Sequence, residues 1–204
     1  MNDYTSFDFT TLDPSTRYRL LAGAVLPRPV AFVTTVDADG TRNAAPFSFF
    51  GVLSHDPGTL AFGVEMRPDG QPKNTLANIR ATRAFTVHIA DVALVKAMEI
   101  CARPAAAGVD KLHRAGLDCV DGTRVPSPRI LAAPVAMECR LLQEIDLGPA
   151  RGIVLGEVVS LFVRSSAVDD ALRIDPAQID AVGRMGGPTY ATTRDCFPAP
   201  LHRA

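Results

Sequence analysis

The feature that most constrains the fold is a run of β-branched and aromatic residues that ends directly in a turn. Residues 29–36 read Pro-Val-Ala-Phe-Val-Thr-Thr-Val, and residues 37–40 read Asp-Ala-Asp-Gly. Such runs favour extended backbone, and an Asp-Gly pair tolerates the positive φ that tight turns need. The sequence therefore predicts a β-hairpin with arms at 29–36 and 41–50.

The returning arm of this hairpin contains Pro46. Proline has no N–H to donate to a strand ladder, so we expect this arm to be bulged, interrupted or at a sheet edge. The surrounding segment, 43–50, combines small residues, a serine and aromatics, which would suit contact with a flat polar heterocycle. An edge strand with a bulge and no ligand is the simpler alternative.

Further strands are predicted at 59–64, 85–90, 135–145 and 152–163, and short helices at 74–80, 92–100, 109–115 and 176–182. Alternation along 135–145 places Glu138 on the solvent-facing side, whereas 152–163 is apolar on nearly both faces and predicts a central strand. The tail containing Gly186 is expected to be mostly irregular. Dominant strands and short inserted helices predict a mainly β (α+β) barrel with peripheral helices in one domain.

Charge and cysteine usage exclude several classes of partner. Twenty-one basic residues against twenty-two acidic ones give a net charge of −1, so no long-range field would attract nucleic acid or anionic lipid. The four cysteines lack zinc-type spacing, no apolar run is long enough to span a bilayer, and the first residues do not resemble a signal peptide. We therefore expect a cytoplasmic protein that binds neither nucleic acid nor membrane.

The motifs of several enzyme classes are missing from the sequence. It contains no GxGxxG or P-loop, no HExxH and no GxSxG elbow. We accordingly expect no metal site and assign no catalytic side chain. If the chain is an enzyme, a cofactor should carry the chemistry.

The best candidate anchor for such a cofactor is Lys73-Asn74-Thr75, with Asn74 or Thr75 expected to cap the helix that starts there. A helix N-terminus offers free amide donors and a positive dipole end, to which this trio adds a cation and a hydroxyl, a combination suited to phosphate. An ordinary surface helix with a solvated lysine is the alternative. Arg28 would be either a solvated turn residue or a second phosphate ligand.

The order of these segments resembles the flavin reductase-like, FMN-binding split-barrel family. The resemblance rests on Arg-Pro-Val-Ala from residue 28, Asn-Ala-Ala-Pro-Phe-Ser-Phe-Phe over 43–50, Lys-Asn-Thr at 73–75 and Arg-Met-Gly-Gly-Pro-Thr-Tyr over 184–190. It implies a homodimeric split β-barrel that holds FMN non-covalently near the dimer interface. It covers about residues 18–198, which leaves an N-terminal extension at 1–17 and a tail at 199–204.

Carried over position by position, the resemblance also implies a set of cofactor-binding residues. The flavin ring and ribityl chain would contact the hairpin, the phosphate would lie at the helix start, and Gly186 with Tyr190 would close over the site. The implied residues are Arg28, Thr34, Thr35, Asn43, Ala45, Phe47, Ser48, Lys73, Asn74, Thr75, Gly186 and Tyr190.

The resulting functional prediction is an FMN-binding oxidoreductase that takes hydride from NADH or NADPH and passes reduced flavin to a partner such as a flavin-dependent monooxygenase. Two alternatives remain open at this point. One is an FMN carrier or sensor without rapid turnover. The other is a flavoenzyme similar to pyridoxamine-phosphate oxidase, for which the sequence shows no basic substrate-phosphate pocket.

Overall fold

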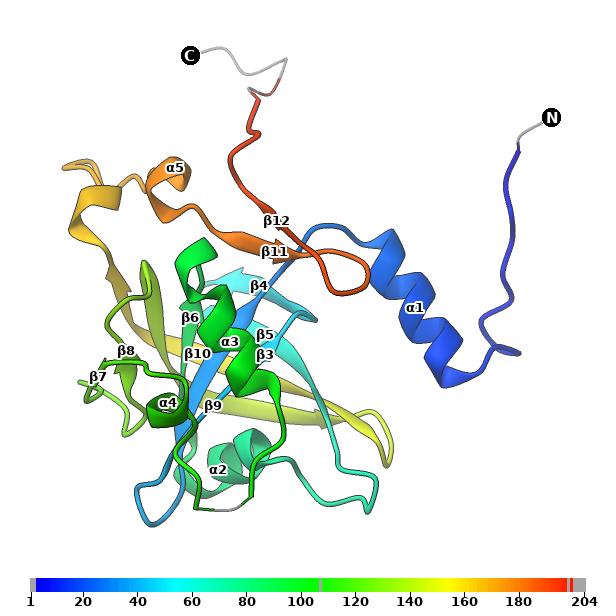
Figure 1. Cartoon of the computed structure of the whole chain (residues 1–204), viewed down its shortest axis with the longest axis horizontal. Coiled ribbons are helices and arrows are strands. Elements are labelled where there is room, and N and C mark those ends of the chain that lie inside the picture. The colour runs from blue at the N-terminus through cyan, green and yellow to red at the C-terminus, as the bar shows by residue number, and fades with distance from the viewer. Residues whose placement is uncertain (1–2, 107, 198, 200–204) are drawn as a thin grey trace.

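A computed structural model describes residues 3–106, 108–197 and 199 (Figure 1). Strands dominate it, as predicted. They are β1 (Arg28–Pro29), β2 (Ala31–Val36), β3 (Arg42–Phe47), β4 (Phe50–His55), β5 (Gly58–Glu65), β6 (Ala84–Ile89), β7 (Cys119–Val120), β8 (Arg129–Ile130), β9 (Val135–Asp146), β10 (Arg151–Val163), β11 (Val182–Arg184) and β12 (Tyr190–Thr192). The helices are α1 (Pro14–Ala24), α2 (Asn74–Thr82), α3 (Val95–Ala102), α4 (Lys111–Arg114) and α5 (Pro176–Ile179), with 3-10 turns η1 (Val92–Leu94) and η2 (Ser165–Ala167).

The main sheet has seven strands and curls back on itself. Its order is β3-β2-β6-β9-β10-β5-β4, with antiparallel pairing throughout. The two edge strands, β3 and β4, are consecutive in the chain and are joined only by Ser48 and Phe49. A link of that length spans roughly 10 Å, so the two edges of the sheet must approach each other. The Gly63 N–H donates to the Phe49 carbonyl at 2.8 Å and ties the link to β5.

The predicted hairpin forms, but its second arm is shorter than expected. β2 pairs with β3 from Ala31–Phe47 to Val36–Arg42, and Pro46 lies in an edge strand, which confirms one of the positions proposed for it. The arm does not continue to residue 50, because the chain leaves β3 after Phe47 and begins β4 at the opposite edge. The predicted central position of 152–163 is confirmed, since β10 lies between β9 and β5.

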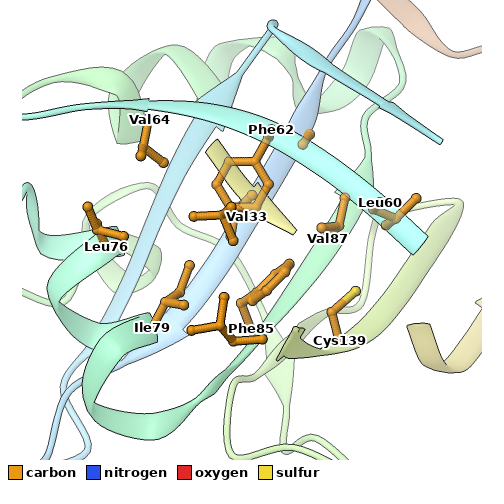
Figure 2. Packing of buried hydrophobic residues seen from close by; sticks show 12 residues of the cluster. Val33, Leu60, Phe62, Val64, Leu76, Ile79, Phe85, Val87 and Cys139 are labelled. Atoms are coloured by element: carbon orange, nitrogen blue, oxygen red, sulfur yellow. The ribbon is translucent and has the colours of Figure 1, made fainter. Parts of the chain in front are cut away.

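The inside of the curled sheet holds the larger apolar core (Figure 2). Phe62 and Phe85 are fully buried and meet edge to face, with ring centroids 5.4 Å apart. Leu76 and Ile79 of α2 close this core from one side. A Cβ on Gly156 would stand 2.3 Å from Cζ of Phe85, so the packing requires glycine at that position.

A second buried layer covers the other face of β2, β3 and β6 with α3, α4 and β8. His88 holds this layer to the sheet, because its Nδ1 bonds the Phe32 carbonyl at 2.9 Å and its Nε2 accepts from the Ile130 N–H at 3.0 Å. The expectation of a solvent-facing Glu138 is wrong. Its fully buried carboxylate accepts from the Thr123 N–H at 2.7 Å and the Arg124 N–H at 2.8 Å, because the segment preceding β8 folds over that face of β9.

The predicted helices form with shifted ends. Lys73, not Asn74 or Thr75, is the N-cap of α2, and residues 92–94 form a 3-10 turn before α3. Asp175 caps α5 as expected, but α5 ends at Ile179 because Asp180 adopts a left-handed conformation with φ of 47°. The tail is less irregular than expected, since β11 pairs with β1 on one side and with β12 on the other in a small sheet.

The N-terminal segment and α1 extend away from the barrel (Figure 1). Helix α1 runs across the predicted boundary between 1–17 and 18–198. Residues 1–2 of the predicted extension, residue 198 and the predicted tail other than residue 199 lie outside the described residues. No helix within the described residues is long and apolar enough to cross a membrane.

Candidate functional site

A cavity of about 700 Å³ opens where the two edges of the sheet meet. Its walls come from the link between β3 and β4, from β5, from the start of β10 and from Tyr18 of α1. The lining residues are Tyr18, Pro46, Phe47, Ser48, Phe49, Phe50, Gly51, Leu53, Ala61, Phe62, Gly63, Val64, Glu65, Lys73, Leu147, Arg151, Gly152 and Ile153. A volume of this size is typical of small-molecule and cofactor sites.

Most of the cavity wall is aromatic or aliphatic. Phe47 packs on Phe62 with ring centroids 4.8 Å apart, and Tyr18 stacks on Phe49 at 6.0 Å. A Cβ on Gly63 would lie only 3.3 Å from Cβ of Phe49, so glycine allows the chain to approach closely here. The arrangement suits a flat, largely apolar ring.

One end of the cavity is charged. The Lys73 Nζ lies 3.0 Å from Oε2 of Glu65, and the Arg151 Nη1 lies 3.1 Å from its Oε1. Two cations therefore share one carboxylate, and all three side chains are about half exposed. This end can accept an anionic group.

Lys73 also marks the N-terminus of α2, which has no side-chain cap. By contrast, α1, α4 and α5 are capped by Asp13, Asp110 and Asp175. The amides of the first turn of α2 thus lack the carboxylate acceptor that those three helices have. Free first-turn amides beside a lysine form a donor set suited to phosphate.

The other two residues of the predicted anchor point elsewhere. The Oδ1 of Asn74 accepts from Nη2 of Arg67. The hydroxyl of Thr75 is buried and accepts from Nδ2 of Asn43 at 3.0 Å. Of the trio, only the Lys73 side chain lines the cavity.

A buried polar cluster joins the hairpin to α2. The Thr35 hydroxyl accepts from Nδ2 of Asn43 at 3.3 Å and from Nδ2 of Asn78 at 3.1 Å. Thr34 points to the opposite face and donates to the Pro128 carbonyl at 2.5 Å. Of the predicted site residues, Asn43 therefore bonds both Thr35 and Thr75, and these bonds fix where the start of α2 lies. Ala45 stands opposite Val33 in the same hairpin.

Two further predicted residues, Arg28 and Gly186, lie between α1 and the small sheet. Arg28 donates to the carbonyls of Ala22, Val25 and Met185 and lies 3.5 Å from the Ser48 hydroxyl. Gly186 packs beside α1, as a Cβ there would lie 3.6 Å from Cα of Gly23.

Tyr190 is held against α3 and not against the cavity. Its hydroxyl donates to Glu99 and accepts from Nη1 of Arg184 at 2.7 Å. Burial, and then the hydrogen bond to Glu99, raise the pKa of Tyr190. Of the predicted site residues, only Phe47, Ser48 and Lys73 line the cavity.

Comparison with known proteins decides the family. The family model described as a flavin reductase like domain matches residues 23–180, which is most of the chain. The chain belongs to the flavin reductase-like family. A curated relative from Deinococcus radiodurans, described as an uncharacterized protein, is 42% identical over 95% of this chain and 88% of its own length.

Solved structures of the family agree with this assignment. The 2-nitrobenzoate 2-nitroreductase of Pseudomonas fluorescens is 31% identical, with a TM-score of 0.89 over 97% of this chain and 96% of that one. Nitrilotriacetate monooxygenase component B of Bacillus cereus is 29% identical, with a TM-score of 0.92 over 98% of this chain and 100% of that one. The flavin reductase-like fold and the oxidoreductase class follow from the family.

The fold is a split barrel with short peripheral helices. A putative flavin reductase with a split barrel domain from Shewanella frigidimarina superposes with a TM-score of 0.83 at 19% identity, covering 98% of this chain and 100% of that one. In the part of the present chain that the structure describes, no group of three His, Cys, Asp or Glu side chains is placed to hold a metal ion.

Sequence reasoning missed Tyr18, Glu65 and Arg151 as cavity residues. Glu65 and Arg151 are cross-strand partners in the β5–β10 ladder, so only the strand pairing reveals that their charges meet. Tyr18 reaches the cavity by stacking on Phe49, a contact between distant parts of the chain that no local pattern predicts.

Proposed function

We propose that this chain is an NAD(P)H-dependent flavin reductase that binds FMN in the cavity between the sheet edges. The observation that carries the proposal is the position of Lys73, at the uncapped start of α2 and at the charged end of an otherwise apolar cavity. A ligand with a flat ring at one end and a phosphate at the other matches this division of the walls.

The proposed contacts follow from the geometry. Lys73 and the first-turn amides of α2 would bind the phosphate, with Arg151 close by. Phe47 and Ser48 would border the isoalloxazine ring. Thr35, Asn43 and Thr75 would act through the position of α2, which their hydrogen bonds fix.

When bound, FMN would supply the redox chemistry by accepting a hydride, that is two electrons and one proton, from the nicotinamide ring of NADH or NADPH. The apolar wall would help to position the two rings and exclude water from the reacting atoms. No acid or base from the protein is required for such a transfer.

We also propose a homodimer. Tyr18, Phe49 and Leu53 line the cavity, yet 52%, 45% and 63% of their surfaces remain exposed. Apolar patches of this kind mark contact surfaces, and a second copy would cover the open side of the cavity. The cytoplasm is the compartment we propose for this assembly.

For the electron acceptor we propose a flavin-dependent monooxygenase that receives reduced FMN. The support is the similarity to nitrilotriacetate monooxygenase component B. The similarity to a nitroreductase provides the competing acceptor, a nitroaromatic compound reduced on this chain itself.

Absorbance spectra test the proposal. The protein is reconstituted with FMN and desalted, and its spectrum is recorded. Spectra are then recorded during anaerobic addition of NADH and of NADPH. Flavin bands that bleach with either nucleotide are expected and identify the donor. Bands that persist with both would contradict the reductase and leave an FMN carrier. Absence of flavin bands after reconstitution would contradict FMN binding itself.

A further inference from the structure

Glu65 is the single carboxylate among the described residues that line the cavity. It ends β5, directly opposite Arg151 in the antiparallel ladder with β10. After Glu65 the chain makes a closed turn, in which Met66 pairs with Pro72 and the Arg67 N–H donates to the Gln71 carbonyl at 2.8 Å. The turn returns the chain at Lys73, next to Glu65. The backbone itself therefore brings these three charges together.

Both carboxylate oxygens of Glu65 are engaged by the cations of the site. Oε2 accepts a hydrogen bond from Nζ of Lys73 at 3.0 Å, and Oε1 forms an ion pair with Nη1 of Arg151 at 3.1 Å. A phosphate at the start of α2 would need the same lysine. It must either take Lys73 from Glu65 or remain a few ångströms from a like charge, and each of these costs binding free energy.

We propose that Glu65 is an internal competitor for the phosphate of the ligand and thereby sets how readily FMN exchanges. This inference rests on the proposed function, because it assumes that FMN binds with its phosphate at Lys73. Glu65 occupies the anion position while the cavity holds no phosphate and returns to it when the ligand leaves. FMN then behaves as an exchangeable substrate that can be passed on after reduction. Affinity for the flavin ring is unaffected.

Flavin-fluorescence titrations of wild type, Glu65→Gln and Glu65→Asp with FMN and with riboflavin, which lacks the phosphate, test this proposal. Glu65→Gln should tighten FMN binding about three- to tenfold, because it removes a half-exposed charge beside Lys73. Riboflavin binding should not change. Glu65→Asp keeps the charge and should bind FMN within about twofold of wild type.

Glu144→Gln is the matched control. Glu144 also pairs with a partly exposed cation, Arg80, but it lies on β9 and outside the cavity lining. The Glu144→Gln variant changes the net charge by the same amount as Glu65→Gln and should leave FMN affinity unaltered. In about 1 M salt, where exposed charges are screened over about 3 Å, the gain of Glu65→Gln should shrink.

The outcomes separate the competitor from other roles of Glu65. Unchanged or weaker FMN binding by Glu65→Gln would overturn the proposal, since a carboxylate that merely positions Lys73 would weaken binding when neutralised. Equal tightening of FMN and riboflavin would overturn it as well. FMN binding by neither wild type nor variant would instead overturn the proposed function.

Discussion

Polar groups in the buried layers and polar groups at the cavity are partnered in different ways. Glu138 accepts three hydrogen bonds from Thr123 and Arg124, and both ring nitrogens of His88 are paired with backbone groups. At the cavity, Lys73 and Arg151 share the one carboxylate of Glu65. The buried groups gain nothing by changing partners, whereas the cavity cations can exchange theirs for a ligand.

The aromatic side chains show the same division. Phe85 is fully buried in the larger core, while Phe49 is 45% exposed at the cavity. One ring stabilises the barrel, and the other leaves apolar surface for a ligand or a second subunit. Stability and binding should therefore respond to different substitutions.

The largest effect is expected for Phe85→Ala compared with Phe49→Ala. Loss of the buried ring leaves a cavity beside Phe62 and should lower the free energy of unfolding by about 3–5 kcal/mol. Loss of the exposed ring should cost about 1 kcal/mol or less. Urea unfolding of both variants measures the difference, and equal losses would erase the distinction between the two regions.

His88 should make stability dependent on pH. Burial, the largest cause, lowers the pKa of His88 from 6.5 to about 4. Between these two pH values the unfolded chain binds a proton that the folded chain does not. The contribution of neutral His88 to the free energy of unfolding is therefore fully present above about pH 6.5. It falls by about 3 kcal/mol as the pH is lowered toward 4. Unfolding free energies from pH 4 to 7 should show this slope, and it should flatten in His88→Gln. An identical slope in that variant would assign the effect to carboxylates.

Asn43→Ala tests how much the buried polar cluster contributes to stability. It removes the donor shared by Thr35 and Thr75 and should destabilise the protein by about 1–3 kcal/mol. The control Asn74→Ala breaks only the contact with Arg67 near the surface and should cost about 0.5 kcal/mol or less. Thermal unfolding of the two variants makes the comparison. Equal melting temperatures would show that the cluster contributes no stability.

Local sequence patterns predicted which strands and helices form better than where these elements lie in the fold. The Asp-Gly turn and the β-branched run were sufficient for the β2–β3 hairpin, and the sheet edge is one of the three alternatives that Pro46 left open. Helix α1 was missed although Asp13-Pro14 is the same start signal as Asp175-Pro176, and Asp13 caps it through the N–H groups of Ser15 and Thr16. The transfer of residues 50–55 to the opposite edge depends on closure of the whole sheet.

The candidate site was only partly predictable for the same reason. Lys73 and Ser48 lie at breaks between elements, where local sequence signals are strong. Glu65 and Arg151 meet through strand pairing, and Arg28 reaches the carbonyl of Met185 in a loop far along the chain. These contacts depend on tertiary structure, so no spacing along the chain reveals them.

Titration of the wild type and of Lys73→Ala with FMN and riboflavin tests the central claim most directly, with Lys96→Ala as a control for an exposed lysine on α3. The wild type and Lys96→Ala should bind FMN about tenfold or more tighter than riboflavin, because charge-assisted hydrogen bonds to the phosphate are each worth about 1.5–3 kcal/mol. Lys73→Ala should lose most of that preference and keep its stability. Equal affinities of the wild type for both flavins, or an undiminished preference in Lys73→Ala, would contradict a phosphate site at the start of α2.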